Sequence, residues 1–181
     1  DVSQVGAEWF FSNLHKWGFA PSTATLLYGM DDFLKNTSHA VVSWNYLQGL
    51  KQESLFPGTR DFSAFLSVPA AVEYLKRWRS EDGETSEGFC RRRVRESAQV
   101  LANAWGTELT IPDDMMATQA MVQLPLQLHV KDLPGVPGVG VRAMLRDRFQ
   151  VEAAIGNFGD RGNFVRLSYA VYNSEKDVAR L

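Results

Sequence analysis

A chain of 181 residues with 45% hydrophobic residues is long enough for one or two compact units, each with a core of its own. Its net charge of -2 gives no reason to expect nucleic acid or a membrane surface as a partner, and no apolar run approaches the roughly 20 residues that span a bilayer. A single cysteine, Cys90, excludes an internal disulfide and fits a soluble protein of the reducing cell interior, without identifying a compartment.

Two apolar segments near the start of the chain predict strands. Residues 5–12 are apolar and aromatic, which suits a buried strand, and residues 25–29 form a second apolar strand after a turn region at 13–23. The stretch 35–60 is mixed and rich in turn-forming residues. It therefore predicts loops, with a short strand around 40–44.

The centre of the chain predicts two helices separated by a linker. Asp61 or Ser63 can cap the first helix, whose apolar residues recur every three to four positions. Residues 80–88 are polar with two glycines, which is typical of a linker. Small and apolar side chains then recur at helical spacing over 89–105, and Gly106 is expected to end this second helix.

The next segments predict a strand, a loop and a helix in turn. Residues 120–128 have the apolar character of a strand. The stretch 131–140 is rich in glycine and proline and predicts a loop. Residues 141–149 predict a short helix, so helices and strands intermix along the chain and the fold class is α/β.

An alternating segment near the end of the chain predicts a strand with two different faces. Over 164–171 the side chains of Val165, Leu167, Tyr169 and Val171 fall on one face, while Arg166 and Ser168 fall on the other. An arginine on the polar face of such a strand is a candidate for binding an anion. Ser174, with Asp177 three residues later, has the spacing of a helix start.

Lys16 is the residue with the most distinctive surroundings in the sequence. Most lysines are solvated surface charges, but aromatic residues flank this one at Phe10, Phe11, Trp17 and Phe19. We expect them to desolvate the ammonium group, and desolvation lowers the pKa of a lysine and frees the neutral amine to attack a carbonyl. Asn13 and His15 add a polar donor and a titratable ring, in a turn that follows an apolar strand.

Three motifs follow one another along the chain. They are Phe11-Ser12-Asn13-Leu14-His15-Lys16-Trp17 with Ala20-Pro21 and Leu26-Leu27-Tyr28 after it, Gly58-Thr59-Arg60-Asp61 with Ser63 and Val68-Pro69-Ala70 after it, and Val165-Arg166-Leu167-Ser168 with Tyr172-Asn173 after it. In this order they resemble class V aminotransferase-like enzymes, in particular the plant-type L-cysteine desulfhydrases and the isopenicillin-N-epimerase-like proteins. The resemblance covers nearly the whole chain.

The resemblance implies a role for each matching residue. Lys16 would be the catalytic lysine that carries pyridoxal 5'-phosphate as a Schiff base, with Asn13 and His15 contacting the cofactor. Thr59 would reach the cofactor phosphate of a neighbouring subunit, which implies a homodimer with shared sites. Arg166 would bind the substrate carboxylate, where the planar guanidinium can form a two-pronged pair.

The resemblance also implies the domain organisation. The chain would be the carboxy-terminal half of a fold-type-I pyridoxal-phosphate enzyme, and we expect that half to be inactive alone. Residues 1–66 would end the large cofactor-binding domain, residues 67–82 would be a connecting helix and linker, and residues 83–181 would form a small α/β domain.

The reaction that the resemblance favours is β-elimination from L-cysteine to sulfide, pyruvate and ammonia. Related desulfurases pass sulfur to a cysteine shortly before the carboxylate-binding arginine, and residues 151–165 contain no cysteine. Epimerisation or transamination of an amino acid remains an alternative of the same class. A different class, a non-catalytic interaction domain that keeps the fold, is disfavoured because Lys16, Thr59 and Arg166 are all present.

Other candidate sites are weaker. Cys90 precedes three arginines and could be a reactive thiolate, but a helix residue turned inward, with the arginines on the solvated face, is the simpler interpretation. His39 and His129 are far from each other and from any cysteine pair, so no metal site is expected. The glycines of 131–140 do not follow a strand in the manner of a dinucleotide-binding loop.

Overall fold

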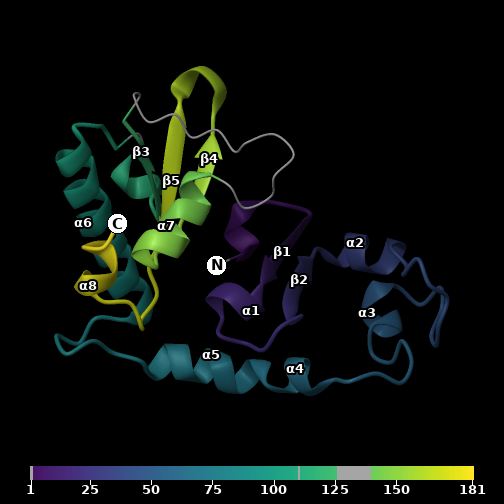
Figure 1. Ribbon diagram of the computed structural model, residues 1–181. Helices are drawn as coiled ribbons and strands as arrows, with labels where there is room; N and C mark the ends of the chain where they lie inside the picture. Colours follow the sequence, from purple (N-terminus) through teal and green to yellow (C-terminus); the bar gives the residue numbers. More distant parts are fainter. Residues whose placement is uncertain (1, 110, 126–139) are drawn as a thin grey trace. The chain divides into compact units, whose positions relative to one another are not determined.

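The computed structural model describes residues 2–109, 111–125 and 140–181 (Figure 1). The chain divides into two compact units, residues 1–77 and residues 78–181. Helices and strands occur in both, so the fold is α/β, as the sequence predicts. The division into a cofactor domain, a connecting helix and a small domain, with bounds at 66 and 82, stays a prediction.

The first unit combines a two-stranded sheet with short helices. Its elements are a 3-10 turn at Val2–Val5, β1 (Trp9–Asn13), α1 (Leu14–Trp17), β2 (Thr25–Gly29), α2 (Asp31–Asn36), α3 (Leu50–Glu53), α4 (Ser63–Leu66) and α5 (Val68–Arg77). The second unit contains α6 (Ser86–Trp105), a 3-10 turn at Asp113–Met115, β3 (Gln119–Gln123), α7 (Val141–Phe149), β4 (Ala154–Asn157), a 3-10 turn at Gly159–Arg161, β5 (Asn163–Ser168) and α8 (Glu175–Val178).

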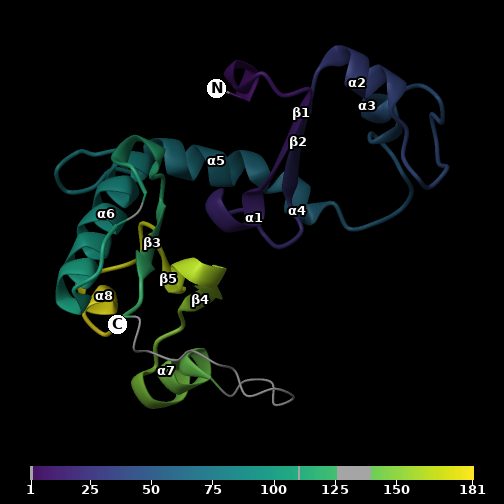
Figure 2. The same cartoon turned by 90° about the horizontal axis from the view of Figure 1, so that it is seen from above.

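Strands β1 and β2 form an antiparallel pair, with α1 in the connection between them (Figure 2). The prediction of a buried strand at 5–12 is wrong in its start and in its burial. The strand begins at Trp9, and the Trp9 and Phe11 side chains are 47% and 58% exposed. Their rings stack on each other, with centroids 5.6 Å apart, on a face that no described element of this unit covers fully.

The strand predicted at 40–44 is absent, and the residues on either side of this segment are held in a loop. The backbone N–H groups of His39 and Leu47 donate to the carboxylate of Glu53 rather than to a neighbouring strand. Asn45 and Leu47 also have positive φ angles, of 61° and 65°, which a strand does not allow. The segment is a loop that a side chain organises.

The helix predicted after Asp61 or Ser63 forms as two pieces, α4 and α5, that meet at Ser67. The N-cap position is Phe62, which gives no side-chain cap, and Asp61 before it supports the helix start by accepting the N–H of Ser63 at 2.8 Å. This hydrogen bond holds the pKa of Asp61 below its usual value. Pro69 lies in the first turn of α5, where its missing N–H costs nothing.

The linker predicted at 80–88 is a polar turn that leads into α6. Ser80 donates its N–H to the carbonyl of Glu84, and Gly83 turns the chain with a φ of 81°. Helix α6 then begins at Ser86, three residues before the predicted start, because Thr85 caps it by accepting the N–H of Gly88 at 3.2 Å. The helix ends at Gly106, which has a φ of 64°, as predicted.

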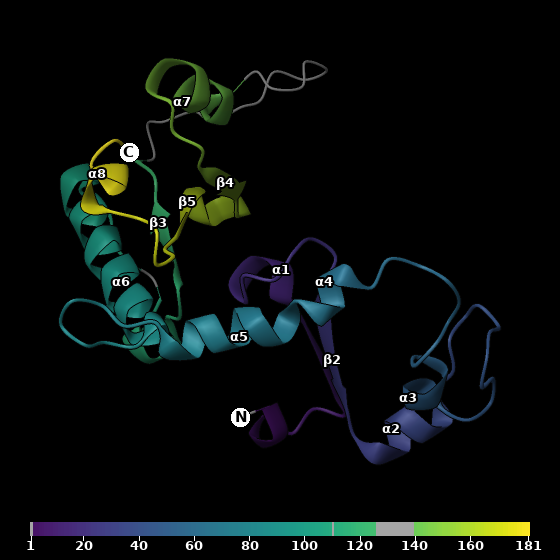
Figure 3. The ribbon, with the colours of Figure 1, turned by 90° about the horizontal axis from the view of Figure 1, so that it is seen from below.

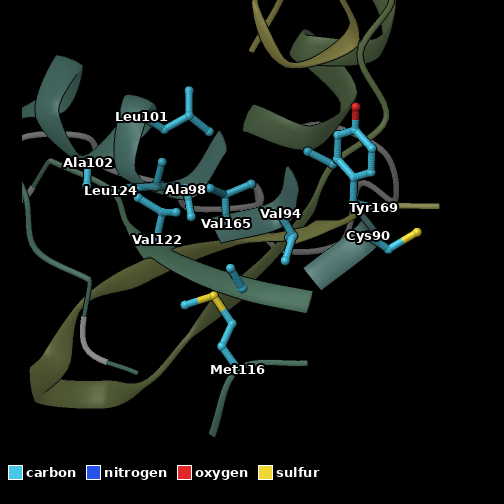
Figure 4. Packing of buried hydrophobic residues seen from close by; sticks show 12 residues of the cluster. Cys90, Val94, Ala98, Leu101, Ala102, Met116, Val122, Leu124, Val165 and Tyr169 are labelled. Atoms are coloured by element: carbon cyan, nitrogen blue, oxygen red, sulfur yellow. The ribbon is translucent and has the colours of Figure 1, made fainter. Parts of the chain in front are cut away.

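The second unit is built on an antiparallel sheet of strand order β3-β5-β4, with α6 against one face (Figure 3). The side chains between helix and sheet form its core (Figure 4). That cluster consists of Cys90, Val94, Ala98, Leu101, Ala102, Met116, Ala120, Val122, Leu124, Ala153, Val165 and Tyr169. The core follows from helical spacing on α6 and from alternation on β3 and β5.

The predicted strand at 120–128 appears as β3, and its last predicted residues lie outside the described part of the chain. The predicted loop at 131–140 also falls there, apart from Gly140. Helix α7 has the predicted bounds. Of the described helices, none has the length and apolar character needed to cross a membrane.

The predicted alternation at 164–171 is confirmed over residues 165–168, where β5 ends, but Phe164, which alternation places on the face of Arg166, is also buried, at 5% exposure. Val165 is 1% exposed in the core, while Arg166 is exposed on the opposite face. Helix α8 begins at the predicted position. The Ser174 N–H donates to the Asp177 carboxylate at 2.8 Å, and the Asp177 N–H donates to the Ser174 carbonyl at 3.1 Å.

Candidate functional site

Lys16 lies on α1, the single turn of helix that follows β1 (Figure 2). Gly18 makes the turn possible, because a Cβ there would lie 2.9 Å from the carbonyl oxygen of Leu14. That carbonyl accepts the N–H groups of Gly18 and Ala20, which ends the helix and returns the chain toward β2. The lysine is therefore held at the tip of a strand–helix–strand unit.

The expected desolvation of Lys16 is not observed. The Lys16 side chain is exposed, and Trp17, one of the aromatic residues that flank it, is 44% exposed. The reason is geometric. In a one-turn helix, neighbouring side chains point in different directions, so aromatic residues that are adjacent to Lys16 in sequence do not cover its side chain. Among the described residues, no carboxylate forms an ion pair with the Lys16 ammonium group, and the amine faces solvent.

His15 is fixed by two hydrogen bonds to one carbonyl. Its backbone N–H donates to the carbonyl of Ala24 at 3.2 Å, and its ring Nδ1 lies 3.0 Å from the same oxygen. Because a carbonyl only accepts, Nδ1 must carry the proton, which leaves Nε2 as the acceptor of the neutral ring. The fold thus sets both the tautomer and the orientation of the ring beside Lys16.

Asn13 is the last residue of β1 and pairs with Thr25 across the hairpin. Its side-chain oxygen accepts the Thr25 hydroxyl at 3.4 Å, a long contact on an exposed face. The structure therefore brings Asn13, His15 and Lys16 together within one turn of chain. This part of the predicted site is local in sequence and needs no long-range contact.

Thr59 lies in the loop between α3 and α4, within the same unit as Lys16, and its side chain is exposed. Gly58 before it has a φ of 132°, which favours glycine. After it, the Arg60 guanidinium lies 5.2 Å and 5.3 Å from the ring centroids of Phe62 and Phe65, which fixes its direction. The role predicted for Thr59 at a neighbouring subunit stays a prediction.

Arg166 belongs to the second unit, where β5 carries it between Met121 on β3 and Ala154 on β4. It lines a cavity of about 330 Å³ beside the end of the sheet. Other polar groups line the same cavity: Arg142, Glu152, Ser168, Asn173 and Asp177. Arg166 and Lys16 thus lie on different units of the chain.

One group of charges near Arg166 was not predicted from the sequence. Glu152 accepts a hydrogen bond from Arg146 at 2.7 Å and another from Arg142 at 2.5 Å, both on α7. These two arginines, Arg146 first, hold the pKa of Glu152 below its usual value. The i,i+4 spacing of the arginines on the predicted helix was the available signal, but their shared carboxylate lies beyond the end of that helix.

Cys90 is buried in the core of the second unit, at 5% exposure. Burial raises the pKa of its thiol, which favours the uncharged form. The arginines that follow it point to carboxylates instead: Arg92 pairs with Glu84 and Glu96, and Arg93 with Glu175. The structural interpretation of Cys90 is confirmed.

Several known proteins are similar to this chain in sequence. No family model matches it. The probable chloroplastic L-cysteine desulfhydrase of Arabidopsis thaliana is 37% identical over 194 residues, covering 100% of this chain and 40% of the relative. The isopenicillin N epimerase of Streptomyces clavuligerus is 26% identical and is covered to 47%. The homologues of this chain are therefore L-cysteine desulfhydrases and isopenicillin N epimerases, which it matches over part of their length.

The resemblance predicted from the three motifs is confirmed. The chain spans 40% to 47% of the length of these curated relatives. Among solved structures, the apo cysteine desulfurase of Thermococcus onnurineus matches 98% of this chain and 46% of its own, with a TM-score of 0.67 and 18% identity. That likeness establishes the fold.

Proposed function

We propose that the protein carrying this sequence is a pyridoxal-phosphate-dependent lyase that converts L-cysteine to sulfide, pyruvate and ammonia. The observation that carries the proposal is the 37% identity to an L-cysteine desulfhydrase along the full length of the chain. Desulfhydrases and desulfurases of this kind depend on pyridoxal phosphate in general. The residues of the Lys16 turn supply the chemistry that such a cofactor needs.

The Lys16 turn fits an aldehyde cofactor. A primary amine that faces solvent and has no carboxylate partner among the described residues can reach and condense with an aldehyde. The fixed ring of His15 and the side-chain amide of Asn13 stand beside it as polar contacts. We therefore assign Lys16 as the covalent anchor of the cofactor, with His15 and Asn13 as residues that orient it.

Pyridoxal phosphate, when bound, supplies an electron sink for the bonds at the α-carbon of an amino acid. In the proposed reaction the Cα–H and Cβ–S bonds of L-cysteine break, sulfur leaves as sulfide, and water enters the carbon product as ammonia departs. Lys16 would hold and move the α-proton as general base. Arg166 would bind the carboxylate, leaving the thiol end of the substrate to react.

Arg166 suits a carboxylate because it is an exposed guanidinium on a rigid strand, at the wall of a cavity. Its neighbour Arg142 already pairs with Glu152. That carboxylate is shared with Arg146, so the Glu152 charge is directed at α7 rather than at Arg166. The strand would thus present a guanidinium that can accept a new carboxylate partner in the two-pronged manner.

Thr59 is proposed to contact the cofactor phosphate in a second copy of the chain, which would make the enzyme a homodimer. Two features support the proposal. The Thr59 side chain is exposed, and the rings that hold Arg60 keep this loop in a defined conformation. A hydroxyl in such a loop can donate to a phosphate oxygen.

Release of free sulfide is favoured over transfer of sulfur to the protein. Residues 151–165 contain no cysteine, and Cys90, the sole cysteine of the chain, is buried with a raised pKa. Residues 151–165 therefore offer no thiol that could accept sulfur, and the thiol of Cys90 is poorly suited to act as a nucleophilic thiolate. Equal amounts of sulfide and pyruvate should therefore form.

The decisive experiment measures sulfide and pyruvate together from L-cysteine in the protein that carries this sequence. Lys16→Ala and Lys16→Arg should lower turnover by about 10²- to 10⁴-fold or more, since neither side chain can act as anchor and base. Lys51→Ala, at another exposed lysine of the same unit, is the matched control and should leave turnover unchanged.

Three outcomes would contradict the proposal. Normal turnover in Lys16→Ala would remove Lys16 from the site. Alanine as the carbon product would indicate transfer of sulfur to the protein. Loss of optical purity without any sulfide would indicate the epimerase chemistry of the other relatives.

A further inference from the structure

Glu53 is the one buried charged or polar side chain found in the described ranges, and it is 1% exposed. It is the last residue of α3, in the first unit. A carboxylate removed from water is costly unless hydrogen bonds or opposite charge replace its hydration. Its neighbours should therefore explain why a glutamate occupies this position.

Both oxygens of Glu53 accept backbone N–H groups from one loop, residues 38–47. Oε2 accepts the N–H of His39 at 2.8 Å, and Oε1 accepts the N–H of Leu47 at 2.9 Å. These two donors lie near opposite ends of the loop. One carboxylate therefore closes the loop and ties it to α3.

The loop has a backbone conformation that needs such support. Asn45 and Leu47 adopt left-handed φ angles of 61° and 65°, which cost energy for residues other than glycine. The Leu47 N–H that Glu53 accepts belongs to one of these two residues. The loop also exposes large apolar side chains, with Val41 at 77% and Trp44 at 70%, so apolar burial contributes little to holding it.

The same place holds a serine and a histidine, but their hydrogen bonds exclude a hydrolytic triad. The Ser54 hydroxyl donates to the Leu50 carbonyl at 2.6 Å, so its proton is not directed at a base. The His39 ring Nε2, 2.9 Å from the same hydroxyl, must then be the donor. Glu53 binds the backbone of His39 through Oε2. The hydrogen bonds of His39, Glu53 and Ser54 therefore hold the loop 38–47 on α3.

The charges around Glu53 are few. The loop contributes His39, α3 itself carries Lys51, and α2, which packs against α3, carries Asp31, Asp32 and Lys35. The His39 N–H, first, and then the Ser38 and Leu47 hydrogen bonds and the charge of His39 lower the pKa of Glu53, against the opposing effect of its burial. The hydrogen bonds outweigh desolvation.

We propose that Glu53 remains ionised while buried and that its negative charge, rather than its volume, holds the loop 38–47 on α3. The charge matters because an ionised carboxylate offers acceptors to both N–H groups at once, and such charge-assisted bonds are about twice as strong as neutral ones. Glu53 is thus a positioning residue that fixes the loop, and it acts independently of the reaction proposed above.

The test is amide hydrogen exchange over residues 38–48 in the protein that carries this sequence, with Glu53→Gln as the main variant. Glutamine keeps the shape but removes the charge and replaces one acceptor with a donor, so exchange in the loop should rise by about tenfold or more. Glu73→Gln is the matched control, because Glu73 is exposed on α5, in the same unit, and pairs with Arg77. It should leave loop exchange unchanged.

A pH series in the unmodified protein tests the charge without a mutation. Since the folded pKa of Glu53 is lowered, loop protection should be complete above the usual glutamate range and should be lost as the pH falls through the lowered pKa. Exchange is corrected for its intrinsic pH dependence and referred to α6. In Glu53→Gln this pH dependence should vanish.

Two results would overturn the proposal. One is unchanged loop exchange in Glu53→Gln. The other is a pH series in the unmodified protein that shows no acid-dependent loss of loop protection relative to α6. If Glu53→Gln does not fold, the pH series alone decides, because it requires no variant.

Discussion

The two units of this chain differ in how many of their apolar side chains are buried. In residues 78–181, helix α6 and the sheet β3-β5-β4 bury a cluster of 12 residues between them (Figure 4). In residues 1–77, the buried apolar side chains are Ala20, Ala24 and Leu50, while Trp9, Phe11 and Trp44 are exposed. The second unit carries its own core, whereas the first buries few apolar side chains fully.

The difference shows what a strand pattern can and cannot establish. Val165 on β5 and Phe11 on β1 both belong to apolar strands, but Val165 is 1% exposed and Phe11 is 58% exposed. The pattern fixes which face of a strand is apolar, whereas burial requires an element that packs against that face. Strand β5 has α6 against it, but the two-stranded pair β1–β2 has no comparable cover among the described residues of its unit.

The largest effect that we expect concerns Arg166, which lies on β5 in the second unit. Arg166→Lys keeps the charge but loses the planar two-pronged pair, so kcat/KM for L-cysteine should fall about thirtyfold to a thousandfold. Because Arg166 is exposed on a strand with a buried opposite face, the fold should be unaffected. Arg148→Lys, at an exposed arginine of α7, is the matched control and should leave kcat/KM unchanged.

The measurement is the initial rate of sulfide release against L-cysteine concentration, with circular dichroism to check the fold. An Arg166→Lys enzyme with normal kcat/KM would show that the carboxylate is bound elsewhere. An equal loss in Arg148→Lys would show that the effect is not specific to the position of Arg166.

The fold could be predicted where local signals determine it. Helix α6 ends at Gly106, α7 has its predicted bounds, and α8 begins with the Ser174 and Asp177 pair, because caps and periodicity act within a few residues. The strand predicted at 40–44 failed for the opposite reason. Glu53 accepts the N–H groups of His39 and Leu47, which lie on either side of that segment, and no pattern in the sequence pairs a glutamate with a particular loop.

The candidate site divides in the same way. Asn13, His15 and Lys16 are adjacent in sequence, so a motif finds them together, and the fold needs only a hairpin to present them. The exposure of Lys16 was not predictable, since it depends on where Trp17 points. The shared contact of Arg142 and Arg146 with Glu152 was equally unpredictable from the helical spacing, because it joins a helix to a residue that follows the helix.

A smaller effect tests the self-contained core of the second unit with one matched pair on α6. Val94 is 0% exposed and Val100 is 61% exposed, so the same change to alanine can be compared on both faces of a single helix. Val94→Ala should lower the free energy of unfolding by about 1–3 kcal/mol, through lost burial and a small cavity. Val100→Ala should change it by less than about 0.5 kcal/mol.

Denaturant unfolding, followed by tryptophan fluorescence, measures both variants. Trp78 and Trp105 report from the second unit. Equal changes in the two variants would show that α6 does not separate a buried from a solvated face, and the contrast between the units would lose its basis.

The smallest effect concerns two helix starts of the second unit that use different chemistry. Helix α6 is capped by the uncharged hydroxyl of Thr85, and α8 by the carboxylate of Asp177, which accepts the Ser174 N–H. That hydrogen bond, first among the causes, holds the pKa of Asp177 below its usual value. The stability it gives is therefore complete above the usual aspartate range and is lost as the pH falls through the lowered pKa.

Amide exchange at the start of α8 should accordingly rise by about two- to fivefold on acidification, the low end of cap strength, whereas the start of α6, whose cap does not titrate, should respond less. Asp177→Asn should show the faster exchange at neutral pH and no further acid effect, because the titrating group is gone. An equal response of both helix starts would indicate acid loosening of the whole unit. That result would mean that its core, rather than its caps, is sensitive to charge, which the apolar composition of the cluster beneath α6 argues against.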